Sequence, residues 1–218
     1  MALTLFDLDN TLITDDSDYL WGQYLVEIGI VDPLEYAEKN RQFFEDYEQG
    51  HLDINQYLKF SLKPLSLHNI QQLNNWRIDY IDTVIRPLVA TGTQKLIEKH
   101  RSQGDTLMII SATNLFITQP IADLLEIPNI LATRPEIKNG SYTGNYTGTA
   151  TFQEGKVTAL KEWLKENNMD LSGSTFYSDS HNDLSLLKIV DYPVAVNPDE
   201  ILQQTAEKNN WPIIDLRN

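Results

Sequence analysis

The stretch Ala2-Leu3-Thr4-Leu5-Phe6-Asp7-Leu8-Asp9-Asn10-Thr11 decides the fold, because a short apolar run in it ends abruptly in two carboxylates. The apolar part predicts a buried strand of a parallel sheet that is covered on both faces. Open α/β sheets bind ligands beyond the carboxyl ends of their strands. We therefore expect Asp7 and Asp9 to lie where the chemistry takes place.

Two neighbouring carboxylates repel each other, and a divalent hard cation or one bound proton usually stabilises such a pair. Either arrangement suits phosphoryl transfer, with Asp7 as nucleophile and metal ligand and Asp9 as general acid and base. The same residues are also typical of an Asp-Asn-Thr turn with capping side chains, which commonly follows a strand. This stretch alone leaves both interpretations open.

Composition limits the class of protein. The chain has 218 residues, which suits one sizeable domain or a core with an inserted subdomain. Its formal net charge of −14 disfavours nucleic acid and anionic membranes as partners. The absence of cysteine excludes disulfides and thiolate catalysis. No basic-then-apolar leader precedes the first strand, and no apolar run approaches the roughly 20 residues that span a bilayer, so we expect a cytoplasmic protein.

Residues 14–86 differ in character from the strand before them and predict successive helices rich in aromatic residues. Asp32 before Pro33 marks one helix start, and Asp53 and Ser66 are expected N-caps of two further helices. The aromatic residues predict the packed interior of a helical subdomain rather than a cofactor site.

The rest of the chain alternates predicted helices and strands, as in an α/β fold. Near-continuous apolar runs at 105–111 and 175–179 end in Ser111 and Asp179, as the first strand ends in Asp7. Asn139-Gly140 predicts the turn of a β-hairpin. Further helices are expected at 93–101, 118–126 with Thr118 as cap, 157–165, 184–189 and 200–209, and further strands at 127–131, 190–196 and 212–215.

Lys156 precedes the predicted helix 157–165, where the first-turn N–H groups and the helix dipole already favour an anion. A lysine there opposes the dipole, although by itself it is equally an ordinary exposed lysine. Together with Ser111, Asp179 and Asp183, and with the Asp7–Asp9 pair, it completes a set of groups that can hydrolyse a phosphomonoester.

At this point the sequence resembles the haloacid dehalogenase superfamily. Its four motifs stand here as Asp7-Leu8-Asp9-Asn10-Thr11, Ser111-Ala112-Thr113, Lys156, and Asp179-Ser180-His181-Asn182-Asp183. The resemblance implies an α/β fold with a Rossmann-like parallel sheet. It implies a core formed by residues 1–13 and 87–218, and a helical cap over the substrate formed by residues 14–86.

The resemblance also implies the roles of the motif residues. Asp7 would attack phosphorus to give an aspartyl-phosphate, and Asp9 would protonate the leaving alcohol and then activate water. Mg²⁺ would be held by Asp7, the main-chain carbonyl of Asp9, and Asp179. The phosphate-binding residues would be Ser111, Lys156 and Asn182, and Asp183 would orient Lys156 or a metal-bound water.

Within the superfamily, the cap position and the early acidic residues resemble the phosphoserine-phosphatase-like group. Asp16 falls where those enzymes pair an acidic residue with the substrate ammonium, whereas Asp15 and Asp18 could be helix caps. The resemblance therefore implies an amine-bearing small-molecule substrate.

Two departures from the phosphoserine enzymes bear on the substrate. Ser61 stands where they place an arginine for the substrate carboxylate, although Lys59 or Lys63 could replace it. The segment after Ser111 lacks their glycines and looks more like relatives that act on histidinol phosphate. We therefore place histidinol phosphate slightly ahead of phosphoserine.

Other classes of protein remain as alternatives. A receiver domain would lack the helical insert, a haloalkanoate dehalogenase would not need Asp9, and a binding protein would not need the intact motif set. A phosphotransferase would use the same intermediate and stays open. The histidines add little: we expect His51, His68 and His100 at the surface and His181 in an exposed loop.

Overall fold

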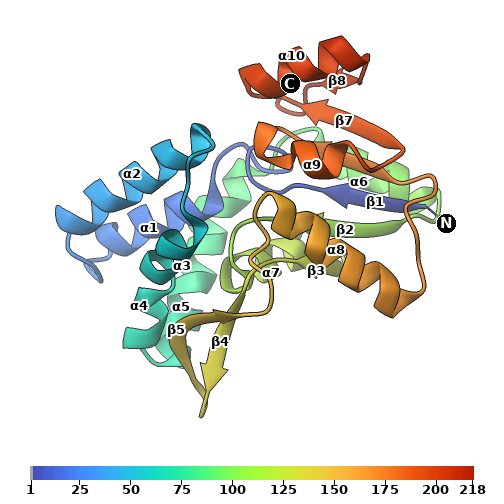
Figure 1. Cartoon of the computed structure of the whole chain (residues 1–218). Helices are drawn as coiled ribbons and strands as arrows, with labels where there is room; N and C mark the ends of the chain where they lie inside the picture. Colours follow the sequence, from blue (N-terminus) through green and yellow to red (C-terminus); the bar gives the residue numbers. More distant parts are fainter. Residues whose placement is uncertain (1) are drawn as a thin grey trace.

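The computed structural model describes residues 2–218 and shows a parallel sheet of six strands in the order β3-β2-β1-β6-β7-β8 (Figure 1). The predicted α/β fold with a Rossmann-like sheet is confirmed. The strands are β1 (Leu3–Phe6), β2 (Thr106–Ile110), β3 (Asn129–Leu131), β6 (Thr175–Ser178), β7 (Tyr192–Val196) and β8 (Ile213–Ile214).

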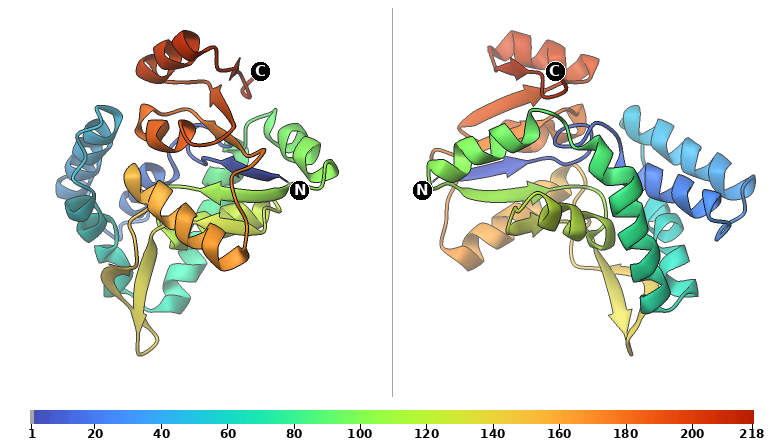
Figure 2. Two further views of the ribbon diagram at one scale, coloured as in Figure 1. Left: turned by 45° about the vertical axis from the view of Figure 1, so that its right-hand side comes forward. Right: turned by 180° about the vertical axis from the view of Figure 1, so that it is seen from behind.

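Side chains alternate between the two faces of this sheet, and helices cover both. Phe6 and Ile109 pack with α6 (Thr93–Ser102) and α7 (Leu115–Leu124). Leu5 packs on the opposite face, which is covered by α8 (Glu154–Asn167), α9 (Leu184–Leu187) and α10 (Glu200–Asn209). In the rear view of Figure 2, α6 therefore lies in front of the sheet and α8 behind it. This double cover explains why the strands read as continuous apolar runs.

The helical segment between β1 and β2 lies beside the carboxyl ends of the central strands (Figures 1 and 2). The segment contains α1 (Ser17–Glu27), α2 (Glu35–Glu48), α3 (Ile54–Ser61), α4 (Lys63–Leu67) and α5 (Ile70–Tyr80), followed by single turns η1 (Ile81–Ile85) and η2 (Arg86–Leu88).

No helix of residues 2–218 is long and apolar enough to cross a membrane.

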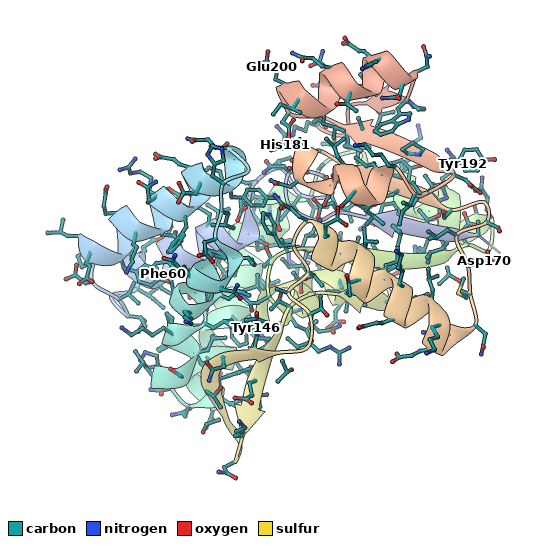
Figure 3. All side chains as sticks on the ribbon, in the orientation of Figure 1. Phe60, Tyr146, Asp170, His181, Tyr192 and Glu200 are labelled. Carbon is teal, nitrogen blue, oxygen red and sulfur yellow. The ribbon has the colours of Figure 1, made fainter. Side chains whose placement is uncertain are left out.

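The predicted hairpin is present as β4 (Arg134–Lys138) and β5 (Ser141–Thr147). Asn139 and Gly140 both have positive φ, as a tight hairpin turn of this sequence requires. The hairpin packs against α3 and α4, and the Tyr146 hydroxyl donates to Asn55 Oδ1 at 2.9 Å (Figure 3). It therefore packs against the lower part of the helical segment in the view of Figure 1.

Two of the predicted caps are wrong. Asn69, not Ser66, caps α5, because Ser66 lies inside the short helix α4. Asn114, not Thr118, caps α7, which begins earlier than predicted and continues through Pro120. The Arg77 guanidinium donates at 2.9 Å to the Phe116 carbonyl, the acceptor that Pro120 cannot use for want of an N–H.

The surface position predicted for His100 is also wrong. Its ring is buried, with Nδ1 2.9 Å from Asp105 Oδ2 and Nε2 2.8 Å from the Tyr177 hydroxyl. Because both ring nitrogens find partners, the polar ring can be enclosed between α6 and the sheet.

Candidate active site

The carboxyl ends of three neighbouring strands bring the predicted motif residues together. Asp7 and Asp9 follow β1, Ser111 follows β2 and Asp179 follows β6, and β1 is paired with both neighbours. Ser111 Oγ lies 3.3 Å from Asp9 Oδ2, and the Thr11 hydroxyl donates to Asp179 Oδ1 at 2.9 Å. The signals that were separate in the sequence thus meet at one edge of the sheet.

Lys156 lies buried between two carboxylates. Its Nζ donates to Asp7 Oδ1 at 3.0 Å and to the Asp183 carboxylate at 2.8 Å. Burial alone lowers the pKa of Lys156, but the charges of Asp183 and Asp7 outweigh it and raise the pKa above its ordinary value. Gly155 is needed beside it, since a Cβ there would lie 1.9 Å from the Ala150 carbonyl oxygen.

The acidic side chains at this edge carry more negative charge than Lys156 offsets. Burial raises the pKa of Asp7 well above its ordinary value despite Lys156, and Asp183, Asp179 and Asp9 add to the shift. Burial also raises the pKa of Asp179 to about 7, although the Thr11 hydroxyl opposes this. A cation bound here would therefore find incompletely compensated carboxylates.

Asp9 is held in one orientation by three donors. Oδ1 accepts from the Ser17 main-chain N–H at 2.7 Å, and Oδ2 accepts from Thr113 Oγ1 at 2.8 Å as well as from Ser111. Sequence reasoning gave Thr113 no role of its own. The available signal was a second hydroxyl, two residues after Ser111.

A cavity opens onto Asp7 and Asp9. Its other walls come largely from the helical segment, whose aromatic side chains were predicted to be only interior packing. That interpretation is incomplete, because five of them line the cavity: Tyr19, Phe43, Phe44, Tyr47 and Tyr57.

Asp16 and Asp18 also line this cavity, and of the two only Asp16 caps a helix. Asp16 is the N-cap of α1, with Oδ1 accepting from the Asp18 N–H at 3.0 Å and the Tyr19 N–H at 2.7 Å. Burial, followed by the charge of Asp9, raises its pKa well above the ordinary value. The alternative that Asp18 is a helix cap is wrong.

Asn182 connects the core with the helical segment, and its neighbour His181 pairs within the core. Asn182 Nδ2 donates to the Tyr47 carbonyl at 3.1 Å, and its Oδ1 accepts from Gln153 at 2.9 Å. His181 Nδ1 lies 2.8 Å from Asp199 Oδ2. Figure 3 labels His181 on the side of the core that faces the helices, and it is partly buried rather than exposed.

The positions considered for binding a substrate carboxylate lie away from the cavity. Ser61 is buried and does not line it, and Lys59 and Lys63 line a second groove on the helical segment. Among residues 2–218, no Lys, Arg or His side chain lines the cavity itself. Its lining charges are the carboxylates of Asp7, Asp9, Asp16 and Asp18.

The sequence profile of haloacid dehalogenase-like hydrolases matches residues 4–188, so the chain belongs to this family of hydrolases. It is 43% identical over 219 residues to a histidinol-phosphatase from Neisseria meningitidis serogroup C, covering 99% of both chains. Within the family, the chain is a phosphatase.

Solved structures agree with this fold. A protein of unknown function from Bordetella pertussis Tohama I superposes with a TM-score of 0.93 at 38% identity, over 99% of this chain and 98% of that one. A substrate-bound phosphoserine phosphatase gives a TM-score of 0.72 at 20% identity, over 100% of this chain and 93% of that one. At that identity, the second similarity supports the fold alone.

Proposed function

We propose that the chain hydrolyses a small phosphomonoester through an aspartyl-phosphate on Asp7, with Mg²⁺ as cofactor. The observation that carries this proposal is the buried ammonium of Lys156, 3.0 Å from Asp7 and 2.8 Å from Asp183 at the edge of the sheet. A phosphoryl group placed here meets a nucleophilic carboxylate and an ammonium that binds its oxygens. Asp183 positions that ammonium, and the Ser111 hydroxyl is a second donor to the phosphoryl group.

Asp9 then handles the protons. The donors from Ser17 and Thr113 fix its carboxylate beside the cavity, where it protonates the departing alcohol and afterwards takes a proton from the attacking water. The hydrolysis returns Asp7 to its free carboxylate. The Asn182 side chain forms hydrogen bonds with the Tyr47 carbonyl and the Gln153 amide. We propose that it also binds an oxygen of the phosphoryl group.

The donors at this edge fit Mg²⁺, which prefers oxygen ligands. We propose Asp7, Asp179 and the main-chain carbonyl of Asp9 as ligands. This set consists of two carboxylates and one main-chain carbonyl. Among residues 2–218, no group of three or more Asp, Glu or His side chains is placed to hold a metal ion. When bound, the ion neutralises charge on the phosphoryl oxygens.

For the substrate, we propose an amine-bearing phosphate ester, with histidinol phosphate ahead of phosphoserine. The name of the Neisseria relative supports this choice. The charge of the cavity supports it too, because a substrate carboxylate would face four Asp side chains and no Lys, Arg or His among the described residues that line it. Phosphoserine, and transfer of the phosphoryl group to an alcohol other than water, are the alternatives.

The test is phosphate release from L-histidinol phosphate and O-phosphoserine, measured with Mg²⁺ and with a chelator. We expect faster turnover of histidinol phosphate, lost on chelation and in Asp7→Asn. Turnover of unrelated esters alone would contradict the substrate. No release from any phosphomonoester by folded, Mg²⁺-loaded protein would contradict the hydrolase.

A further inference from the structure

The Asp18 carboxylate has one oxygen without a hydrogen-bond partner. The residue is only 6% exposed, and Oδ1 accepts from Asn114 Nδ2 at 3.3 Å, whereas Oδ2 accepts from no donor. A buried acceptor left unpaired is destabilising, and native proteins rarely retain one without a reason. Because Asp18 lines the same cavity as Asp7 and Asp9, a ligand is the natural donor.

The surroundings of Asp18 within the protein satisfy this carboxylate only in part. Burial raises its pKa to about 7; the Tyr57 hydroxyl and the Asn114 amide lower the pKa, and the charge of Asp9 raises it. Asp16, two residues earlier, uses its Oδ1 to accept from the Asp18 and Tyr19 N–H groups of α1 rather than to bond the Asp18 side chain. A group that completes the bonding of Oδ2 therefore brings its own hydrogen-bond donor or positive charge.

The shape of the cavity limits what that group can be. Tyr19 stacks on Phe44 with ring centroids 4.6 Å apart, and Phe43 meets Tyr57 edge to face at 5.4 Å. Walls of this kind favour planar rings and cations over flexible polar chains. A carboxylate beside Asp16 and Asp18 is disfavoured, since the described residues that line the cavity offer it no Lys, Arg or His as partner.

We infer that Asp18 determines substrate specificity, with its free Oδ2 accepting an N–H from a planar cationic nitrogen ring, such as imidazolium, held among the aromatic walls. The inference rests on the proposed phosphatase function and adds a second recognition point to it. Asp16 then remains for an aliphatic ammonium. Asp18 makes no bond to phosphorus and moves no proton in the reaction.

The test uses Asp18→Asn and two esters, L-histidinol phosphate with its ring and phosphoethanolamine with an ammonium but no ring. We expect the ratio of their kcat/KM values to fall by about 10- to 100-fold, which is the usual effect of losing one hydrogen bond to a charged group. The loss should appear in KM for the ring-bearing ester more than in kcat. Asp82→Asn is the matched control, because it removes one carboxylate that is exposed and paired with Arg86.

Binding of the alcohol products gives a readout that needs no turnover. By calorimetry, L-histidinol should bind the wild-type protein at least about tenfold more tightly than it binds Asp18→Asn, with Asp82→Asn resembling the wild type. Thermal unfolding checks that each variant is folded.

The outcomes separate the two proposals. An unchanged ratio and unchanged histidinol binding, with phosphate release that still depends on Asp7, would overturn the role of Asp18 and leave the phosphatase in place. Absence of phosphate release from every ester would overturn the proposed function. In that event, histidinol binding that depends on Asp18 would still support the ring site, and its absence would overturn it.

Discussion

Lys156 shows why single residues at this site have large effects. The ammonium and its two carboxylate partners are all buried, so water solvates them little. Replacing a buried ion-pair partner leaves an uncompensated charge, whereas a surface lysine contributes little.

We predict that Lys156→Met lowers the free energy of unfolding by about 3–5 kcal/mol at pH 7 and abolishes phosphate release. The loss should be smaller at pH 5, where the carboxylates it leaves behind can take up protons. Urea unfolding measures it, with Lys161→Met on the exposed side of α8 as control. Equal losses for the two variants would contradict the buried pairing.

Asp18 should make stability depend on pH in a defined direction. Its pKa is about 7 in the folded protein and 3.8 ordinarily, so between these values the folded state holds a proton that the unfolded state releases. Stability therefore falls as pH rises from about 4 to 7. Each pKa unit corresponds to about 1.4 kcal/mol.

Accordingly, Asp18→Asn should be more stable than the wild type at pH 8, by on the order of 2–4 kcal/mol, and closer to it at pH 4.5. Urea unfolding in the presence of a chelator measures the difference. For Asp82→Asn, the difference in free energy of unfolding from the wild type should not grow with pH, because Asp82 is exposed. A gap for Asp18→Asn that stays constant across this range would refute the assignment.

The sequence located Asp7, Ser111, Lys156 and Asp179 because each follows a strand or begins a helix, which fixes where its side chain lies. It could not locate Asp18 or Tyr57 as cavity residues. Their position depends on how the helical segment packs over the sheet edge, and periodicity carries no information about that packing.

At the scale of elements, the errors concern helix starts. Ser66 and Thr118 are capping residue types, but Asn69 and Asn114 occupy the true starts and accept the first N–H groups. Several residues near a helix start can cap equally well locally, so tertiary packing decides among them. Asp53 was predicted correctly.

The hairpin allows a matched pair of substitutions. Gly140 and Gly144 both have positive φ, 76° and 81°, but a Cβ at Gly140 meets nothing within 4 Å, whereas one at Gly144 lies 3.2 Å from Ser66 Oγ in α4. Alanine strains the backbone at both sites by about 1 kcal/mol.

We therefore expect Gly140→Ala to lower the free energy of unfolding by about 1 kcal/mol, and Gly144→Ala to lower it by about 1 kcal/mol more. The additional loss reflects displacement of the hairpin from α4. Urea unfolding of the two variants provides the comparison. Equal losses would mean that the hairpin does not support the helical segment.

At the scale of the whole molecule, the sequence predicted a parallel α/β sheet, but it did not predict the order of the strands. The insert begins directly after the first strand, and every later strand is joined through a helix or the hairpin, so few sheet topologies were open. The hydrogen bond from Asn182 to the Tyr47 carbonyl joins the core to the helical segment. The sequence could not predict this bond, because the two residues lie far apart in the chain.

A net charge of −14 and a buried acidic site make two different predictions about cations. Any salt should stabilise the chain modestly by screening its self-repulsion. Mg²⁺ bound by Asp7 and Asp179 should stabilise it further, by about 2.7 kcal/mol at a free concentration 100 times the Kd. For a chain of this length, that raises Tm by roughly 5–10 °C.

Thermal unfolding in MgCl₂ and in NaCl of equal ionic strength separates the two effects, and Asp179→Asn should lose only the Mg²⁺-specific part. A rise that NaCl reproduces, or that Asp179→Asn retains in full, would assign the stabilisation to the overall charge and remove the case for a metal at the ends of β1 and β6.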